Sequence, residues 1–314
     1  MKSSNRKKPR TTPPTLPELD QTKRSVLNSL TSLQSRRSYQ HAMDEFIEWY
    51  CSEPRLALNR GVVLRYRLQL EAKNLAASTI NVRLAAVRRL AYEAADTGLL
   101  SPELVAGIRR VKGVPQLGRR VGNWLSSAEG ERLLSGTTAD TLRQKRDAAI
   151  ISLLLGCGLR RSEVVALAFG DIQKREDHWA IVDLVGEAGH VRTVPVPAWV
   201  KAAVDHWTEN ASISNGKLFR SIRKNGTVWG TGITQNVIWY VVKAGAVRAG
   251  ITALAPHDLR RTCARLCHGA GGELEQIQFL LGHASVQTTE RYIGCKQDLA
   301  RAVSDRLPFA GGRS

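Results

Sequence analysis

The 314-residue chain lacks the features of a membrane-spanning or secreted protein. No run approaches the ~18 consecutive apolar residues that a membrane-spanning helix needs. The N-terminal stretch MKSSNRKKPRTTPP has basic residues but no apolar segment of a secretory signal. The five cysteines have no regular spacing, which indicates a reducing cytoplasm rather than a disulfide framework. Cys263, Cys267 and His268 stand together like metal ligands but lack a second ligand pair, so we predict no metal site.

Acidic residues are scarce relative to basic ones. The sequence has 28 Asp and Glu against 46 Lys and Arg, which gives a formal net charge of +18. Such an excess says nothing about the fold, but it favours a polyanionic partner. Nucleic acid is the first candidate, and an anionic membrane surface is the alternative. The length suits two domains of roughly 150 residues each.

The N-terminal third predicts a small all-helical domain. Apolar residues recur at helical spacing over residues 35–50. Asn59 and Ser78 are placed to begin a second and a third helix, and Gly98 to end the third. The tripeptide Ser101-Pro102-Glu103 predicts the start of a fourth helix, since proline is tolerated in a first turn.

Arginines are interleaved with the apolar stripe of the predicted third helix. A charge run is usually a solvated face, so this one gains a functional meaning only from a partner. If the partner is DNA, we expect the helix to lie in or along a groove, with the linker that follows tracking the backbone. The predicted DNA-contacting residues are Arg83, Arg88, Arg89, Lys112, Arg119 and Arg120.

The remainder of the chain predicts a second, mixed domain. The stretch KGVPQLGRRVGNW, residues 112–124, is rich in glycine and basic residues without a helical period, so it predicts a linker. Beyond it the pattern is helical, with breaks at Gly156 and Gly158. The runs WAIVDLV and VRTVPVP then predict a β-hairpin, and helices resume from Trp199. The predicted fold class is mainly α with a small antiparallel β-sheet.

Three segments of this second domain carry groups suited to an oxyanion. In GLRRSE, Arg160 follows a glycine-bearing turn. In HDLRRT, His257 and Arg260 are three residues apart and therefore lie on one helical face. In LGHASVQTTERYIG, His283 precedes Tyr292 by nine residues.

Arginine, histidine and tyrosine together suit phosphoryl transfer without a metal. Guanidinium groups bind phosphate oxygens bidentately, and the loss of one such donor typically costs about 10²–10³ in rate. Histidine donates hydrogen bonds or relays protons near neutrality. A tyrosine, with an ordinary pKa of about 10, needs help to become a nucleophile. We expect neighbouring arginines to favour its phenolate.

These residues occur in the order Arg160, His257-x-x-Arg260, LGH at 281–283 and Tyr292, and the surrounding motifs are GLRRSE, HDLRRT and LLGHASVQTT. This arrangement resembles the signature of the tyrosine recombinase (phage integrase) family, in particular of its Xer-like bacterial members. The resemblance implies that Tyr292 attacks a scissile DNA phosphate, forms a 3′-phosphotyrosyl link and releases a 5′-hydroxyl. The two arginines and the two histidines would surround that phosphate. The implied activity is site-specific recombination or integration, with no metal, ATP or other cofactor.

The resemblance covers nearly the whole chain and implies its domains. These are a disordered basic arm (1–20), an all-helical core-binding, DNA-binding domain (21–112), a basic linker (113–124), a mixed α+β catalytic domain (125–309) and a tail (310–314). The expected partner is double-stranded DNA of the bacterial nucleoid, clamped by the two domains. The family implies a homotetramer on two paired DNA sites and allows an accessory directionality factor; no membrane partner is expected.

One position departs from the family pattern. A hairpin lysine normally protonates the leaving 5′-oxygen, and in GEAGHVRTVP that position falls on Glu187. A carboxylate ~4 Å from a phosphate costs roughly 4 kcal/mol at an effective dielectric near 20. Three alternatives stay open: His190 takes the role, another lysine such as Lys224 reaches in, or the enzyme is slow.

Several residues near the signature have structural interpretations. Glu163 is expected to pair with an arginine or to cap a helix, whereas Arg261 and Arg265 are expected to touch solvent or the DNA backbone. The apolar spacing in residues 297–307 predicts a last helix that docks on its own domain or on a neighbouring protomer.

Two other functions compete with recombination. A type IB topoisomerase uses related chemistry, but the recombinase-like first domain argues against it. A DNA-binding protein with weakened or lost catalysis is the other alternative, because Glu187 occupies the position of the family's general acid.

Overall fold

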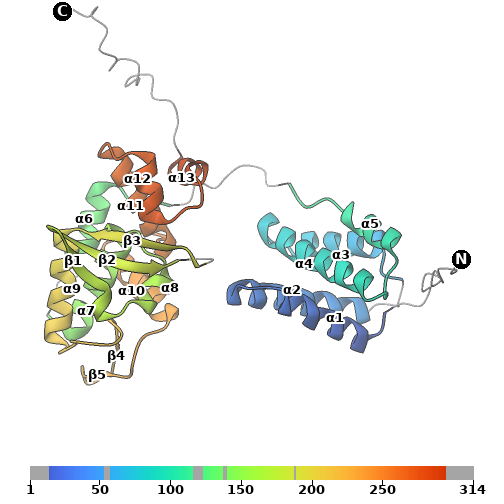
Figure 1. Ribbon diagram of the computed structural model, residues 1–314, viewed down its shortest axis with the longest axis horizontal. Helices are drawn as coiled ribbons and strands as arrows, with labels where there is room; N and C mark the ends of the chain where they lie inside the picture. Colours follow the sequence, from blue (N-terminus) through green and yellow to red (C-terminus); the bar gives the residue numbers. More distant parts are fainter. Residues whose placement is uncertain (1–13, 53–56, 116–122, 137–139, 187–188, 295–314) are drawn as a thin grey trace, which may run out of the picture. The chain divides into compact units, whose positions relative to one another are not determined.

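The computed structural model describes residues 14–52, 57–115, 123–136, 140–186 and 189–294 (Figure 1). The chain forms two compact units, residues 1–119 and 120–314. Unit 1 is all-helical and unit 2 combines helices with small antiparallel sheets, which confirms the predicted fold class. The division falls inside the predicted linker 113–124. No helix in the described part of the chain is long and apolar enough to cross a membrane.

Unit 1 is built from helices that share one core. Two long helices, α2 and α4, pack against each other and against α1. Met43 and Phe46 of α2 and Leu84 and Val87 of α4 are fully buried between them. The helices are α1 Leu16–Asn28, α2 Leu33–Ser52, α3 Arg60–Ala72, α4 Ala77–Asp96 and α5 Pro102–Arg109.

The helix signals of unit 1 are confirmed with one exception. The side chains of Asn59 and Ser101 each accept a hydrogen bond from a backbone N–H in the first turn of α3 and α5. Gly98 follows α4 with φ +76°, a left-handed conformation that suits glycine at a helix end. Ser78, however, lies inside α4, which begins at Ala77.

The first helix begins earlier than the sequence predicted. We expected residues 1–20 to be a disordered arm, yet α1 starts at Leu16. The carboxylate of Glu18 accepts hydrogen bonds from the N–H and the hydroxyl of Thr15, at 2.8 and 2.9 Å, and so closes the first turn. Leu19 and Val26 are fully buried. Burial of these two side chains therefore fixes the helix; residues 1–13 lie outside the described residues.

Unit 2 is organised around α7, which is buried almost all round. Ile150, Ile151, Leu153 and Leu154 have no exposed surface, and α7 packs against α9, α10 and α11. A buried helix of this kind fixes the elements around it. The helices are α6 Ser127–Ser135, α7 Leu142–Gly156, α8 Arg161–Ala166, the 3-10 turn Phe169–Asp171, α9 Ala198–Asn210, α10 Gln235–Arg248, α11 Pro256–Gly269, α12 Leu274–Leu281 and α13 Val286–Ile293.

The larger sheet contains the predicted hairpin. Its antiparallel order is β1-β2-β3, and the pairing of β2 with β3 shifts register between Ile181 and Leu184. Asp183 has φ +53° at this point, as expected for a bulge that bends the hairpin. The first strand was not predicted, because its sequence IQKR is polar and mostly exposed. The strands are β1 Ile172–Arg175, β2 His178–Val185, β3 Val191–Val196, and the separate pair β4 Ser221–Ile222 and β5 Val228–Trp229.

Candidate active site

The predicted catalytic residues come from four segments of unit 2. Arg160 is the N-cap residue of α8. His257 and Arg260 lie in the first turns of α11. His283 follows α12, and Tyr292 lies on α13. The helices α11, α12 and α13 share a small core of their own, which fixes α13, the helix of Tyr292, beside α11, the helix of His257 and Arg260.

Arg260 is the most deeply buried charged group of the site, with 1% of its surface exposed. Its Nη1 donates to the Gly158 carbonyl at 2.5 Å, and its Nη2 donates to the Leu281 carbonyl. Burial, followed by the charge of Arg160, lowers its pKa to about 10, so it stays protonated at neutral pH. The guanidinium thus ties the turn before α8 to the end of α12.

Glu163 holds two arginines at once. Its Oε1 accepts from Arg160 Nη1 at 3.0 Å, and Arg192 donates to both oxygens at 3.0 and 2.9 Å. Its Oε2 also accepts from the Arg160 backbone N–H at 2.8 Å. Burial opposes its ionisation most strongly, but the bonds from Arg192 and Arg160 outweigh burial and lower the pKa of Glu163. The predicted structural role of Glu163 is confirmed.

Arg192 is a member of the site that the sequence interpretation missed. It lies on β3, and its Nε donates to the Leu280 carbonyl at 3.2 Å as well as holding Glu163. Gly282, with φ +63°, follows α12, and a Cβ there would meet Arg192 Cδ at 2.9 Å. The R-x-VP word beside the hairpin was the available signal. Arg192 therefore connects the hairpin to Glu163 and to the turn that carries His283.

The Tyr292 hydroxyl is held by His257. It lies 3.3 Å from His257 Nε2 and donates to the His257 carbonyl at 3.3 Å. The Tyr292 ring stands edge-on to His257 and to His283, with centroid distances of 5.5 and 5.1 Å. Two imidazoles and the nucleophile candidate therefore meet at one point, as the sequence predicted.

The pKa of Tyr292 corrects one expectation. Burial is the largest influence and raises it, whereas Arg260, Arg261 and Arg160 lower it in that order. The net pKa is raised. The arginines thus act in the expected direction, but in the protein without DNA burial outweighs them and the phenol is favoured.

Both histidines are disfavoured as cations. Burial first, and then Arg260 and Arg160, lower the pKa of His283 to about 4. Its Nδ1 lies 3.0 Å from the hydroxyl of Thr289, which is fully buried. Partial desolvation first, and then Arg260, also lower the pKa of His257. Each ring is therefore neutral near pH 7 and has one N–H to donate.

Two further arginines of α11 contact α13. We expected Arg261 and Arg265 to touch solvent or the DNA backbone. In addition to their exposed parts, the Arg261 guanidinium lies 4.9 Å from the centroid of the Tyr292 ring, and Arg265 Nη1 donates to the Ile293 carbonyl at 2.5 Å. Arg265 also lies 4.0 Å over the ring of Trp124. Both side chains are half-buried against neighbouring elements.

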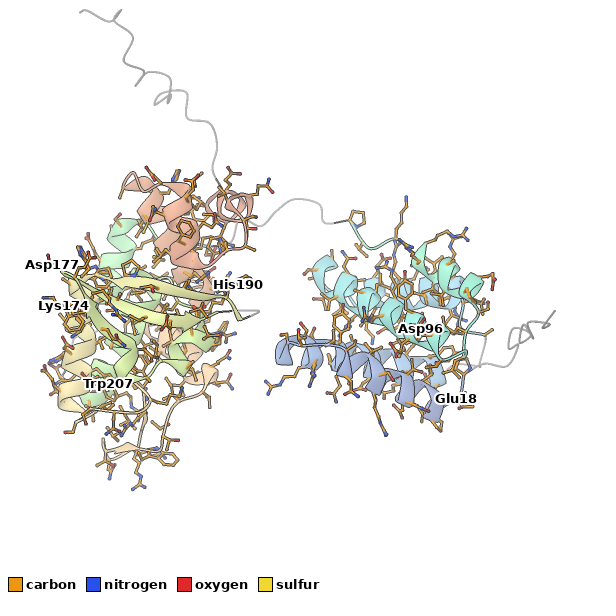
Figure 2. All side chains as sticks on the ribbon, in the orientation of Figure 1. Glu18, Asp96, Lys174, Asp177, His190 and Trp207 are labelled. Carbon is orange, nitrogen blue, oxygen red and sulfur yellow. The ribbon has the colours of Figure 1, made fainter. Side chains whose placement is uncertain are left out.

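The residues considered for the general acid lie in different parts of unit 2. Glu187 lies outside the described residues. His190 is exposed at the hairpin end (Figure 2), and its carbonyl accepts from the Gly186 N–H at 2.7 Å. A Cβ on Gly186 would meet Arg192 Nη1 at 3.0 Å, so the hairpin end lies against the arginine network. Lys224 lies in the turn between β4 and β5, which Figure 1 shows at the end of unit 2 opposite α12 and α13.

Two of the predicted DNA-contacting arginines of unit 1 have partners within that unit. Arg83 Nη2 lies 2.6 Å from a carboxylate oxygen of Glu45. Arg88 Nη2 donates to the Val111 carbonyl. Both side chains are half-buried, so part of their role is to hold α4 to its neighbours.

The other predicted DNA contacts are more accessible or lie outside the described residues. Arg89 is exposed, and its Nη2 donates to the Ser29 hydroxyl at 3.2 Å. Lys112 is also exposed. Arg119 and Arg120 fall in the segment 116–122, outside the described residues.

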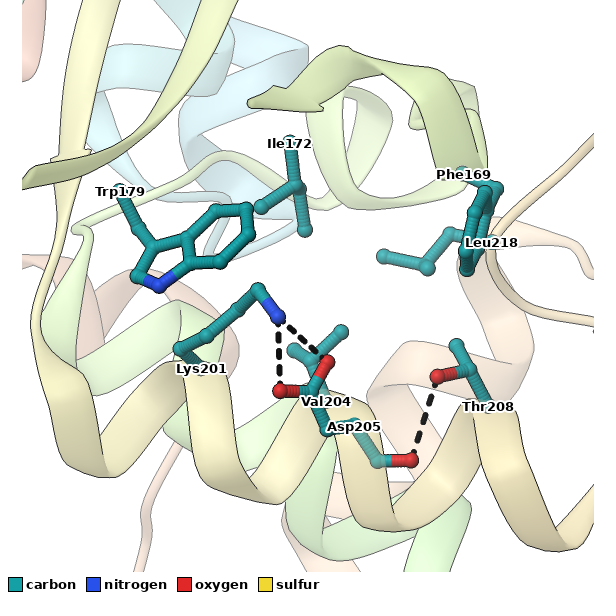
Figure 3. A pocket seen from close by; sticks show the side chains of 8 residues that line it. All are labelled: Phe169, Ile172, Trp179, Lys201, Val204, Asp205, Thr208 and Leu218. Atoms are coloured by element: carbon teal, nitrogen blue, oxygen red, sulfur yellow. Dashed lines mark hydrogen bonds and ion pairs between the residues drawn. The ribbon is translucent and has the colours of Figure 1, made fainter. Parts of the chain in front are cut away.

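A separate hollow of unit 2 lies between the sheet and α9 (Figure 3). Its polar groups are paired with each other: Lys201 Nζ binds both oxygens of Asp205, at 2.6 and 2.7 Å, and lies 3.8 Å over the Trp179 ring. None of the residues that hold Tyr292 lines it, so it is distinct from the candidate active site.

Both units match models of one family. Residues 123–297 match the phage integrase family, and residues 27–98 match the phage integrase N-terminal SAM-like domain. Tyrosine recombinase XerD of Shewanella oneidensis is 30% identical over 73% of this chain and 73% of its own length.

Solved structures agree in fold. The XerH site-specific recombinase bound to palindromic difH substrate aligns with a TM-score of 0.67 and 18% identity, covering 88% of this chain and 80% of that chain. A lambda integrase dimer bound to a COC' core site aligns with a TM-score of 0.68 and 14% identity, over 88% of this chain and 93% of that chain. With the family match spanning more than half of its residues, this chain belongs to the phage integrase family, the family of the tyrosine recombinases.

Proposed function

We propose that this protein is a site-specific DNA recombinase in which Tyr292 attacks the scissile phosphate. The phenol loses its proton as its oxygen forms a bond to phosphorus, the bond to the 5′-oxygen breaks, and that oxygen takes up a proton from the general acid and leaves as a hydroxyl. The product is a 3′-phosphotyrosyl link. Since one phosphodiester replaces another, rejoining needs no nucleotide cofactor. The surroundings of Tyr292 carry this proposal: its hydroxyl contacts His257, its ring stands edge-on to His257 and His283, and the charges of Arg260 and Arg160 act on its ionisation.

The charges of the site favour an anion. Arg160 and Arg192 share one carboxylate, and within the described residues Arg260 donates only to carbonyl oxygens. The charge of Arg260 is therefore suited to the phosphate, and above all to the additional charge of the transition state. The neutral His257 and His283 can each donate one hydrogen bond to its oxygens.

For the leaving oxygen we propose His190 as the general acid. It is exposed at the hairpin end, which lies against Arg192 and Glu163 at Gly186, whereas Lys224 lies in the β4–β5 turn at the opposite end of unit 2. His190→Ala should then slow cleavage, and a 5′-phosphorothiolate substrate, whose leaving group needs no proton, should restore the rate. Normal cleavage of an ordinary substrate by His190→Ala would remove this candidate, and Glu187→Lys would show whether a lysine at 187 can serve.

The proposed partner is double-stranded DNA within the bacterial cytoplasm. XerH and the lambda integrase dimer were solved bound to DNA, and the charge of +18 supports the same partner here. A homotetramer on two paired sites, with an accessory directionality factor, extends this proposal. Affinity should fall steeply with salt because phosphate contacts release counterions. An Arg89→Gln change should reduce the slope of log affinity against log salt by about one.

Covalent capture tests the function directly. Nicked duplexes with randomised sequence around the nick are incubated with the full chain, and adducts are isolated under denaturing conditions and sequenced. An adduct formed by the unmodified protein but not by Tyr292→Phe supports the recombinase chemistry. Binding without an adduct would identify a DNA-binding protein. Relaxation of supercoiled plasmid without joining of two sites would identify a topoisomerase.

A further inference from the structure

One face of α11 is directed at the end of α13. His257, Arg261 and Arg265 are spaced at i, i+4 and i+8, so they lie in a row along the helix. Each of them contacts residue 292 or 293: His257 the hydroxyl of Tyr292, Arg261 its ring, and Arg265 the Ile293 carbonyl. The row therefore holds the nucleophile by its functional group, its aromatic face and its backbone.

Arg261 contacts an aromatic ring, whereas His257 and Arg265 make polar contacts. Its guanidinium carbon lies 4.9 Å from the Tyr292 ring centroid, a distance at which a cation is attracted to an aromatic face. Its buried Nε has no hydrogen-bond partner within the described part of the chain. A half-buried arginine usually ends on a carboxylate or a carbonyl. Here the aromatic ring accounts for its position.

We infer that Arg261 is a positioning residue for the nucleophile: its guanidinium lies on the Tyr292 ring, fixes the orientation of the phenol and favours its ionised form. This inference rests on the proposed role of Tyr292. Arg265, one turn further along α11, holds the backbone of the same helix and does not contact the ring.

The groups that face Tyr292 come from several elements. Within α11 they are His257, Asp258, Arg260 and Arg261; Arg160 faces it from the start of α8, and His283 from the turn before α13. Arg260 and Arg160 would share their charge with a bound phosphate. Arg261, placed on the ring itself, would continue to stabilise the phenolate, and its charge already acts to lower the pKa of Tyr292.

A titration without DNA tests the inference. The ultraviolet absorbance of phenolate is followed against pH in the full chain and in Tyr292→Phe, and the difference isolates Tyr292. In Arg261→Gln this difference titration should move to higher pH. In Arg223→Gln, a matched control whose guanidinium lies 5.7 Å over the Trp229 ring, it should stay in place. An unchanged titration in Arg261→Gln, or an equal shift in Arg223→Gln, would overturn the inference.

A second variant protects the test against misfolding. Arg261→Lys keeps the charge but loses the planar group, so Tyr292 should titrate between the unmodified protein and Arg261→Gln. If circular dichroism shows that Arg261→Gln is unfolded, a Lys variant that titrates like the unmodified protein overturns the inference.

Single-turnover cleavage of a captured nicked duplex supplies the kinetic test. Arg261→Gln should cleave about two- to fivefold more slowly at neutral pH, with its rate profile displaced to higher pH and its DNA affinity retained. A loss of affinity with an unmoved profile would assign Arg261 to the DNA backbone and refute the inference. Adduct formation by Tyr292→Phe would refute the proposed function instead, and the titration would stand on its own.

Discussion

Unit 1 and the active site of unit 2 both bury arginine, but they differ in how many arginines share a carboxylate. In unit 1, Arg83 is the arginine that contacts Glu45, which also lies 3.6 Å from the His41 ring, and Arg88 donates to a backbone carbonyl. In unit 2, Arg160 and Arg192 share Glu163, and Arg260 donates only to carbonyls in the described part of the chain.

The difference separates structural from functional use of the same residue type. A buried charge without its own counterion costs several kcal/mol of desolvation, so a fold gains nothing from keeping one for stability alone. Unit 1 balances its half-buried Arg83. In unit 2, two arginines share Glu163, and the partners of Arg260 in the described residues are carbonyl oxygens, an arrangement that suits an anion under the proposed function. The comparison can be tested by removing one group at a time.

The largest expected effect is the loss of the shared carboxylate. Glu163→Gln removes the carboxylate charge that Arg192, whose side chain is only 10% exposed, binds with both nitrogens, and should destabilise unit 2 by about 3–5 kcal/mol. Glu45→Gln should cost less, about 1 kcal/mol, because the Glu45 side chain is 29% exposed whereas that of Glu163 is 3% exposed. Denaturant unfolding of the full chain measures both, and equal costs would break the comparison.

The next effect concerns catalysis. Arg260→Lys keeps the positive charge but loses the planar guanidinium, whose several N–H groups can donate to two carbonyls and a phosphate at once. Cleavage of a captured nicked duplex should slow by about 10²–10³. Arg88→Lys in unit 1, assayed with saturating DNA, is the matched control and should cleave at the ordinary rate. A comparable loss in both variants would mean that Arg260 acts through stability.

A pH effect of intermediate size should come from His283. Its pKa is lowered to about 4, whereas an unfolded histidine titrates near 6.5. Above about pH 6.5 both states are neutral; as pH falls towards 4 the unfolded chain takes up the proton first, so stability is lost in that window. His283→Gln should flatten the fall of Tm between these values. An equal fall of Tm in His283→Gln and in the unmodified protein would contradict this account.

The smallest expected effect comes from replacing one glycine with positive φ in each unit. Gly98 and Gly282 both have positive φ, but a Cβ on Gly98 meets nothing within 4 Å, whereas one on Gly282 meets Arg192 Cδ at 2.9 Å. Gly98→Ala should therefore cost about 1 kcal/mol, for backbone strain alone. Gly282→Ala should cost about 2–4 kcal/mol, since the side chain of Arg192 must also move. Thermal unfolding of the two variants would contradict this account if their costs were equal.

Some elements of the fold could be predicted from the sequence because the hydrogen bonds that begin or end them are local. Asn59 and Ser101 cap helices through side chains three residues from their donors. The start at Leu16 was missed because the burial of Leu19 and Val26 depends on α2 and α4. The strand β1 was not predicted because its extended conformation depends on pairing with β2, and its polar residues have no strand pattern of their own.

The site divides in the same way. Glu163 was expected to pair with an arginine because Arg160 is three residues away. Arg192 was missed because its contact with Glu163 spans 29 residues of sequence. Arg261 and Arg265 were assigned to solvent or DNA because nothing in α11 alone indicates that α13 covers them.

The sequence by itself determined which groups are available and in what order: two arginines, two histidines and a tyrosine, on helices whose ends local hydrogen bonds specify. Only the tertiary structure decided what those groups experience. Burial depends on which distant segments pack together, and it is burial that raises the pKa of Tyr292 above what its arginine neighbours alone would set. The same packing gives Glu163 two arginines and leaves Arg260 with carbonyl partners.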